Sequence, residues 1–275
     1  MRKINLLMAA FAAGGLLLTG CGGDDEPTTE AGGDTGTGAP AADLGLIQDG
    51  TLTVCSDIPY PPFEVEDPAS PSGYSGFDMD IMQAIADGLG LELAVQDVGF
   101  DPLASGTVLA AGQCDIGASA MTITEERKAA LDFSDPYYDS LQSLLVPPDS
   151  DIAAIGDLAG KTVGVQTGTT GQSYATENAP DAEIVDFPSD AELWPALQAG
   201  NIDAILQDLP VNIEHAKTEG YQVVEEYPTD EQYGFAFAKG EKTALLEAVN
   251  EQLQTMRDDG SYQEIYDKYF ATDAS

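Results

Sequence analysis

The residues that could bind a charged small molecule gather in one stretch, 114–138, which reads CDIGASAMTITEERKAALDFSDPYY. Its apolar start predicts a short buried strand over 115–118, followed by a polar turn and then a helix. Arg127 is one of three arginines in a chain that carries 48 acidic residues. A guanidinium meets a carboxylate with two parallel hydrogen bonds, so Arg127, together with Ser119 and Thr122, predicts a site for an anion. The alternative is a surface arginine near the start of a helix.

The elements that must position this stretch alternate between strands and helices. Periodicity and Gly-marked joints predict strands over 51–55, 91–95, 115–118, 162–166, 183–187, 202–207 and 234–238. Apolar faces predict helices over 77–89, 100–111, 191–199, 242–259 and 262–270, with another beginning at 172. The alternation favours parallel sheets covered on both faces, and it starts again after Leu158. The sequence therefore predicts two similar α/β half-chains.

Polar residues follow four of the predicted strands: Asp57, Ser119–Thr122, Thr167–Thr170 and Asp208. Ligands of such sheets bind outside the carboxyl ends of the strands. If the two half-chains point these ends at each other, all four turns line one cleft. The chain would cross between the halves near 138–144 and return near 232–237.

Each turn suggests a partner for one end of a zwitterion. The Thr-Gly-Thr-Thr-Gly turn, 167–171, offers N–H groups at the positive end of a helix, although a plain tight turn is the alternative. Asp208 offers a negative partner for an ammonium, or else a helix cap or Asx turn before Pro210. Tyr60 and Phe100 would form flat apolar walls or core, and His215 is expected at the surface.

The first residues indicate export. Arg2 and Lys3 precede a short apolar run, so residues 1–20 predict a signal peptide. The Leu-Thr-Gly-Cys ending resembles a bacterial lipobox, which makes Cys21 the expected lipidation residue. Residues 21–45, rich in Gly, Thr, Asp and Ala, predict a flexible acidic linker.

Charge and cysteine content exclude several classes of function. A net charge of −38 argues against nucleic acid and against anionic membranes as partners. One histidine and no paired-ligand spacing argue against a metal site, and no cofactor is expected. Cys55 and Cys114 could pair, but level strand ends at Asp57 and Ser119 would offset them by ~10 Å. Because a disulfide needs Cα atoms within ~7 Å, the pairing stays open at this stage.

Six motifs resemble the family 3 extracellular solute-binding proteins, the substrate-binding subunits of polar amino-acid ABC transporters. They are SDIPYPPFE at 56–64, GFDMD at 76–80, AMTITEER at 120–127, DFSDPYY at 132–138, GVQTGTTG at 164–171 and GSY at 260–262. The resemblance covers about 46–270 and implies an α/β periplasmic-binding-protein type II fold, with two lobes, two hinge strands and a ligand cleft. We expect lobe 1 over 46–139 plus 236–275 and lobe 2 over 140–235.

The resemblance also implies a ligand-binding set: Asp57, Tyr60, Phe100, Ser119, Met121, Thr122, Arg127, Gln166, Thr167, Thr169, Thr170 and Asp208. In it, Arg127 binds the α-carboxylate, helped by Thr122 and Thr170. Asp208 and the Ser119 carbonyl take the α-ammonium. Tyr60 and Phe100 flank the side chain, and Asp57 lies near its far end. The chain departs from the family at Ala120, where some members carry a hydroxyl, and at Cys114.

An acidic ligand would need a second cation, and the turns offer only Arg127. Asp57 and Gln166, with Glu64 as a further candidate, suit a cationic or amide side chain, which favours arginine, lysine or glutamine. The expected protein is a monomeric, lipid-anchored, extracytoplasmic binding subunit without enzymatic activity, working with permease subunits. A sensor module is one alternative. A cyclohexadienyl-dehydratase-like enzyme is another, with Glu64 as its general acid.

Overall fold

A computed structural model describes residues 43–271 of the chain. The predicted signal peptide and Cys21 lie outside the described residues, as does all of the predicted linker except its last three positions. Within 43–271, none of the helices combines the length and the apolar character that crossing a membrane requires.

A first mixed sheet has the strand order β4-β1-β5-β12-β6. β1 pairs in parallel with β4 and β5, whereas β12 pairs antiparallel with β5 and β6. The strands are β1 (Thr51–Ser56), β4 (Glu92–Asp97), β5 (Ile116–Gly117), β6 (Leu131–Phe133) and β12 (Ala236–Ala238), with a separate hairpin of β2 (Val65–Glu66) and β3 (Tyr74–Ser75). The associated helices are α1 (Phe77–Leu89), α2 (Phe100–Ala104), α3 (Thr107–Ala110), α7 (Thr243–Asp259) and α8 (Ser261–Phe270).

The helix predicted from the four-residue apolar spacing is present as α1. Phe77, Ile81 and Ile85 are fully buried in the core of this lobe, and Gly90 ends the helix in a left-handed conformation. The helix predicted over 100–111 is instead two short helices, because Gly106 adopts a φ of 79° between them. The helix predicted after the polar turn is also wrong. Only a 3₁₀ turn forms at Arg127–Ala129, because the chain then joins the first sheet as β6.

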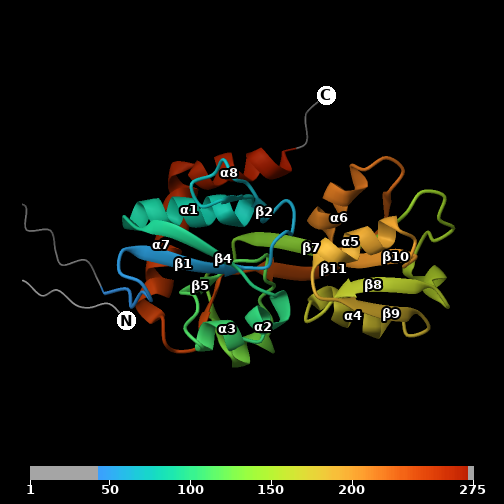
Figure 1. The fold of residues 1–275 in the computed structure, drawn as a ribbon, viewed down its shortest axis with the longest axis horizontal. Coiled ribbons are helices and arrows are strands. Elements are labelled where there is room, and N and C mark those ends of the chain that lie inside the picture. The colour runs from blue at the N-terminus through green and yellow to red at the C-terminus, as the bar shows by residue number, and fades with distance from the viewer. Residues whose placement is uncertain (1–42, 272–275) are drawn as a thin grey trace, which may run out of the picture. The chain divides into compact units, whose positions relative to one another are not determined.

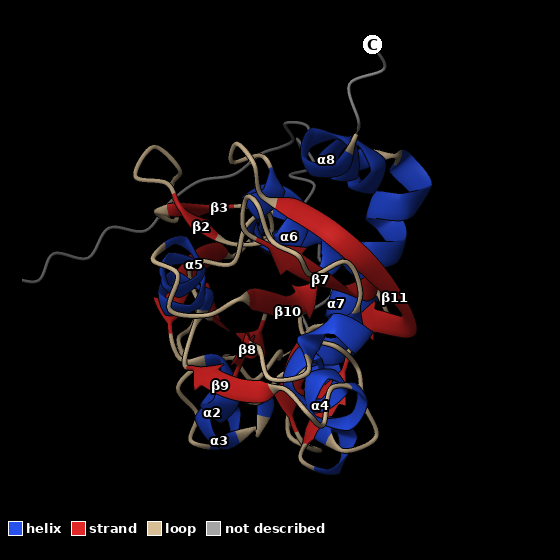
Figure 2. Ribbon diagram, turned by 90° about the vertical axis from the view of Figure 1, so that its right-hand side faces the viewer, coloured by secondary structure: helices blue, strands red, loops and turns tan. Residues whose placement is uncertain are grey.

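A second mixed sheet has the order β11-β7-β10-β8-β9. Its elements are β7 (Tyr138–Val146), a 3₁₀ turn (Ile155–Leu158), β8 (Thr162–Gln166), α4 (Thr170–Asn178), β9 (Glu183–Phe187), α5 (Asp190–Gln198), β10 (Ala204–Asp208), α6 (Leu209–Ala216) and β11 (Gln222–Tyr233). Figure 2 shows α4 and α5 on opposite sides of this sheet. In β8, Val163 packs with Ala175 of α4, while a Cβ on Gly164 would stand 2.5 Å from Leu193 of α5.

Two long antiparallel strands, β7 and β11, connect the two lobes. The chain leaves the first sheet after β6, enters the second through β7, and returns through β11 to β12 (Figure 1). β7 pairs with β11 from Tyr138–Tyr233 to Val146–Gln222. The sheets are thus not the purely parallel sheets expected, because β7, β11 and β12 run antiparallel to their neighbours.

Cys55 and Cys114 lie close enough to form a disulfide, with Cα atoms 5.7 Å apart. The strand ends at Asp57 and Ser119 are level, as expected, since Cys55 pairs with Gly117. The estimated offset is wrong because Cys114 precedes the two-residue strand β5 and does not continue its direction. Both cysteines are buried in an apolar cluster against α2 and α3.

Candidate functional site

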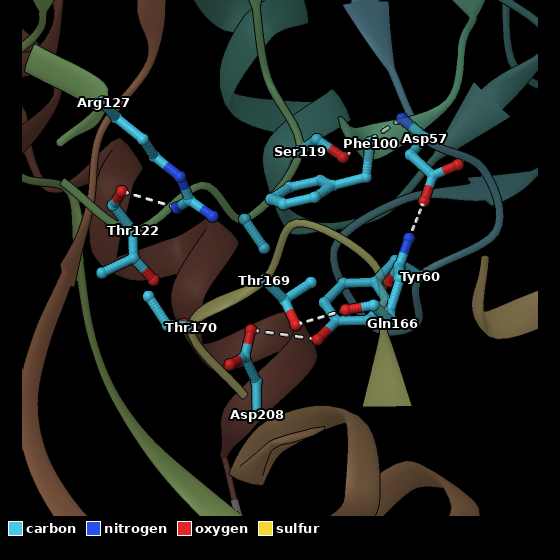
Figure 3. A pocket seen from close by; sticks show the side chains of 11 residues that line it. Asp57, Tyr60, Phe100, Ser119, Thr122, Arg127, Gln166, Thr169, Thr170 and Asp208 are labelled. Atoms are coloured by element: carbon cyan, nitrogen blue, oxygen red, sulfur yellow. Dashed lines mark hydrogen bonds between the residues drawn. The ribbon is translucent and has the colours of Figure 1, made fainter. Parts of the chain in front are cut away.

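One cavity lies where the two lobes meet, and most of the predicted ligand-binding residues line it (Figure 3). Its lining comprises Asp57, Tyr60, Phe100, Ser119, Ala120, Thr122, Arg127, Gln166, Thr169, Thr170 and Asp208. The first seven come from the first lobe and the other four from the second. Among these lining residues Arg127 is the only cation.

Arg127 is held with its guanidinium towards the cavity. Its Nη1 donates to the Thr122 carbonyl at 2.7 Å and its Nη2 to the Gly168 carbonyl at 2.9 Å. The guanidinium carbon also lies 5.2 Å from the centre of the Phe100 ring, a cation–π distance. Two of five N–H bonds therefore have protein acceptors within 43–271, which leaves three for a ligand. Burial lowers the pKa of Arg127 from its usual value, and the charge of Asp208 opposes that shift.

Asp208 presents its carboxylate to the same cavity from the second lobe (Figure 3). It stands at the start of α6 but its side chain does not cap that helix, so the capping alternative is not what forms. The carboxylate accepts from the hydroxyls of Tyr60 at 3.0 Å and Tyr233 at 2.6 Å, and from the Gln142 amide at 2.5 Å. Burial raises the pKa of Asp208 to about 7, with a further contribution from Glu231.

The Thr-Gly-Thr-Thr-Gly turn leads into α4 as expected. Thr169 is the N-cap, and its Oγ1 accepts from the Gln172 N–H at 3.1 Å. The next residue, Thr170, donates its hydroxyl to Glu231 at 2.7 Å. The start of α4 therefore faces the same cavity as Arg127, with the positive end of the helix dipole towards it.

A different part of the cavity carries Asp57 and Gln166 (Figure 3). The Gln166 amide donates to Asp57 Oδ2 at 2.5 Å and lies 3.2 Å from the Pro188 carbonyl. Burial raises the pKa of Asp57 to about 7. The Gln166 bond opposes this shift, and the nearby Asp97 adds to it. This end of the cavity offers oxygen acceptors and an ionisable carboxyl group.

Two buried acids, Glu64 and Asp78, hold the turn at Ser119 and Ala120 that follows β5. Ser119 accepts from the Asp57 N–H at 3.1 Å and donates to Glu64 at 2.7 Å. Ala120 has a φ of 43°, a left-handed conformation that costs a non-glycine residue ~1–2 kcal/mol. The Asp78 carboxylate accepts its N–H at 2.8 Å, which stabilises the turn. Burial raises the pKa of Glu64 well above its usual range and that of Asp78 to about 7.

Comparison with known proteins identifies the family. The model of the bacterial extracellular solute-binding proteins, family 3, matches residues 52–272. The chain belongs to this family. The ABC transporter glutamine-binding protein GlnH of Bacillus subtilis (strain 168) is 38% identical to it over 217 residues, which cover 77% of this chain and 78% of that protein.

Two solved structures resemble this solute-binding protein throughout their length. An ancestral arginine-binding protein bound to glutamine matches with a TM-score of 0.76 and 36% identity, over 82% of this chain and 100% of that one. The ancestral amino-acid-binding protein AncCDT-1, a precursor of cyclohexadienyl dehydratase, matches with a TM-score of 0.74 and 39% identity, over 80% and 96%. These matches confirm the predicted two-lobed α/β fold.

Two members of the predicted set do not line the cavity of the solute-binding protein. Met121 is fully buried in the core of the first lobe, and the Thr167 hydroxyl donates to the Phe187 carbonyl at 3.1 Å. The expectation that His215 lies at the surface is wrong. His215 is buried, stacks on Trp194 at 4.3 Å, and lies 3.0 Å from the carboxylate of Asp190.

Three residues beside the cavity were not predicted from the sequence: Gln142 on β7, and Glu231 and Tyr233 on β11. All three are buried, and all bond to cavity residues. Gln142 had a usable signal, since it is a polar residue inside an apolar run. Glu231 and Tyr233 had little, because the acidic, proline-containing segment 222–233 does not have the composition of a strand.

Proposed function

We propose that this protein is the extracytoplasmic substrate-binding subunit of an ABC importer and that it binds a free L-amino acid between its lobes. The observation that carries the proposal is the placement of Arg127 and Asp208 in one cavity, with opposite charges from opposite lobes. An α-amino acid carries a carboxylate and an ammonium on one carbon, so it can satisfy both groups at once. The names of the glutamine-binding relative and of the arginine-binding structure support the same class of ligand.

The ligand class we propose is an amino acid with a cationic or amide side chain, with arginine, lysine and glutamine favoured. Asp57 and Gln166 supply a carboxylate and amide groups at the side-chain end of the cavity. A glutamate or aspartate ligand would place a second carboxylate in a cavity whose described lining has one cation, Arg127. Tyr60 and Phe100 provide apolar surface for the methylene groups of a long side chain.

A thermal-shift screen tests this choice. At ~100 times its dissociation constant a ligand adds ~2.7 kcal/mol to the free energy of unfolding, so L-Arg, L-Lys or L-Gln should raise the unfolding midpoint. The Asp57→Asn variant should lose about tenfold or more in affinity for a cationic ligand, because a buried charge-assisted bond contributes about 1.5–3 kcal/mol. It should change affinity for glutamine much less. Stabilisation by L-Glu alone would rule out the proposed ligand class.

The likeness to a precursor of cyclohexadienyl dehydratase is the one observation that favours an enzyme. Glu64, the candidate general acid, is fully buried behind Ser119 and is not among the lining residues. That position supports binding over catalysis, because a general acid must reach the proton it transfers. Incubation with prephenate or arogenate, followed by product analysis, distinguishes the two functions.

The remaining parts of the proposal concern the setting of the protein. We propose that it is monomeric and tethered to the cell membrane through lipid on Cys21, with the acidic linker leading to the lobes. The lipobox-like sequence supports the anchor. Permease subunits of the importer would be its protein partners.

A further inference from the structure

Glu231 lies where three parts of the molecule meet. The residue is only 8% exposed. Oε2 accepts from the hydroxyl of Thr122, which follows β5 in the first lobe, at 2.7 Å, and from that of Thr170, at the start of α4 in the second lobe, also at 2.7 Å. Oε1 accepts at 3.0 Å from the amide of Gln142 on the connecting strand β7. One side chain therefore joins both lobes and both connecting strands.

The backbone of β11 is shaped to place this side chain. Tyr227 pairs with Gln142, and Glu231 pairs with Ser140, so β11 carries two more residues than β7 over the same span. Asp230, within the bulge, has a φ of 54°, in the left-handed region. Bulges bend a strand and re-aim its side chains. The bulge in β11 lies immediately before Glu231, whose carboxylate bonds to Thr122 and Thr170, two residues that line the cavity.

The network continues from Glu231 through Gln142 to Asp208. The Gln142 amide is within hydrogen-bond distance of Asp208 as well as of Glu231, and Gln142 is fully buried. Asp208 in turn accepts from Tyr60 of the first lobe. Arg127, proposed for the ligand carboxylate, bonds to Thr122 and so to Glu231. Asp208, proposed for the ligand ammonium, is therefore connected to it through Glu231 and Gln142 on the two strands that link the lobes.

We propose that Glu231 is a positioning residue that holds the two lobes together at the carboxylate end of the site. This inference rests on the proposed amino-acid binding. The bonds from Glu231 to Thr122 and to Thr170 can exist together only while the lobes are closed, so they favour the closed arrangement. Glu231 does not contact the Asp57 end of the cavity. It therefore raises affinity for every amino-acid ligand by the same factor and does not select among side chains.

The test compares three variants of the full chain. Glu231→Ala removes the hydrogen bonds that Glu231 accepts from Thr122 and Thr170, Glu231→Gln keeps an oxygen acceptor of the same reach, and Glu226→Ala removes an exposed acid from the same strand. Calorimetry should show that Glu231→Ala weakens binding of arginine, lysine and glutamine about tenfold each. Glu231→Gln should restore most of that loss, and Glu226→Ala should have no effect.

A second measurement does not depend on any ligand. Spin labels attached through ketone-bearing amino acids at the exposed positions Ala110 and Glu177 report the separation of the lobes. Glu231→Ala should shift the distance distribution to longer values without added ligand, and Glu226→Ala should leave it unchanged. Tighter ligand binding by Glu231→Ala would show that Glu231 competes with the ligand carboxylate and would overturn the inference, as would an unchanged distance distribution. If the unaltered protein binds no amino acid, the proposed function fails and the distances still decide the role of Glu231.

Discussion

The strongest prediction concerns the charge of Arg127. We expect Arg127→Met to remove recognition of the ligand carboxylate while an unbranched apolar side chain replaces the guanidinium that lies over the Phe100 ring. The matched control is Arg257→Met. Arg257 is the only other arginine among the described residues, it is exposed, and its guanidinium bonds to the Pro136 carbonyl away from the cavity.

The expected magnitude follows from the bonds that the guanidinium can make. Three N–H bonds remain after those to Thr122 and Gly168, and two of them suffice for a bidentate carboxylate. Each charge-assisted hydrogen bond contributes about 1.5–3 kcal/mol, so the pair contributes about 3–6 kcal/mol. The dissociation constant should therefore rise roughly 10²- to 10⁴-fold.

The assay pairs this substitution with a change in the ligand. Calorimetry would measure an amino acid and the amine that lacks its carboxylate, such as arginine and agmatine, against the unaltered protein and each variant. The unaltered protein and Arg257→Met should prefer the amino acid by a large factor. Arg127→Met should bind the two ligands about equally, because neither ligand can make a carboxylate–guanidinium contact with this variant.

One pattern of affinities would contradict this role of Arg127. If Arg127→Met weakens the amine as much as the amino acid, Arg127 acts on the shape of the cavity and not on the carboxylate. Unchanged affinity for the amino acid would remove Arg127 from the site altogether.

The remaining predictions concern two other charged residues, Asp208 and Lys242. Because burial raises the pKa of Asp208 to about 7 and its ionised form pairs with an ammonium, affinity should fall by up to about tenfold for each pH unit below 7, and Asp208→Asn should flatten that profile measured from pH 5 to 8. Between about pH 4 and 7 the carboxyl group of Asp208 stays protonated in the folded protein but has lost its proton in the unfolded chain. The free energy of unfolding, measured with urea, should therefore fall as pH rises through that window. Lys242→Met should lower the free energy of unfolding by about 2–4 kcal/mol, because it leaves the fully buried Asp115 without its cation at 2.8 Å. Lys239→Met, which breaks a half-exposed ion pair, should cost less than about 1 kcal/mol in the same unfolding experiment.

Periodic apolar patterns were sufficient to predict several elements. α1 appeared because its four-residue spacing puts Phe77, Ile81 and Ile85 on one face, and β9 has the bounds that were predicted for it. The convergence of Arg127, Thr170 and Asp208 on one cavity also followed from strand ends. These features depend on local composition and on the rule that ligands of α/β sheets bind outside the carboxyl ends of the strands.

Pairing between distant segments was not predictable in the same way. β11 was missed because its acidic, proline-containing sequence is tolerated only at a sheet edge, where it pairs with β7 alone. His215 was placed at the surface because its partners, the buried Asp190 and the half-buried Trp194, lie on another helix. The Cys55–Cys114 pairing likewise depends on how the chain enters β5.

The sequence by itself determined the class of the site: one arginine among many acids, threonines at a helix start and an aspartate at a strand end call for an amino acid's charged groups. Only the tertiary structure decided how the site is held together. Gln142 and Glu231 lie 89 residues apart and meet at 3.0 Å because β7 and β11 pair antiparallel with a bulge. That contact depends on the register between the two strands. The register is set when the whole chain packs, so neither segment's own sequence predicts it.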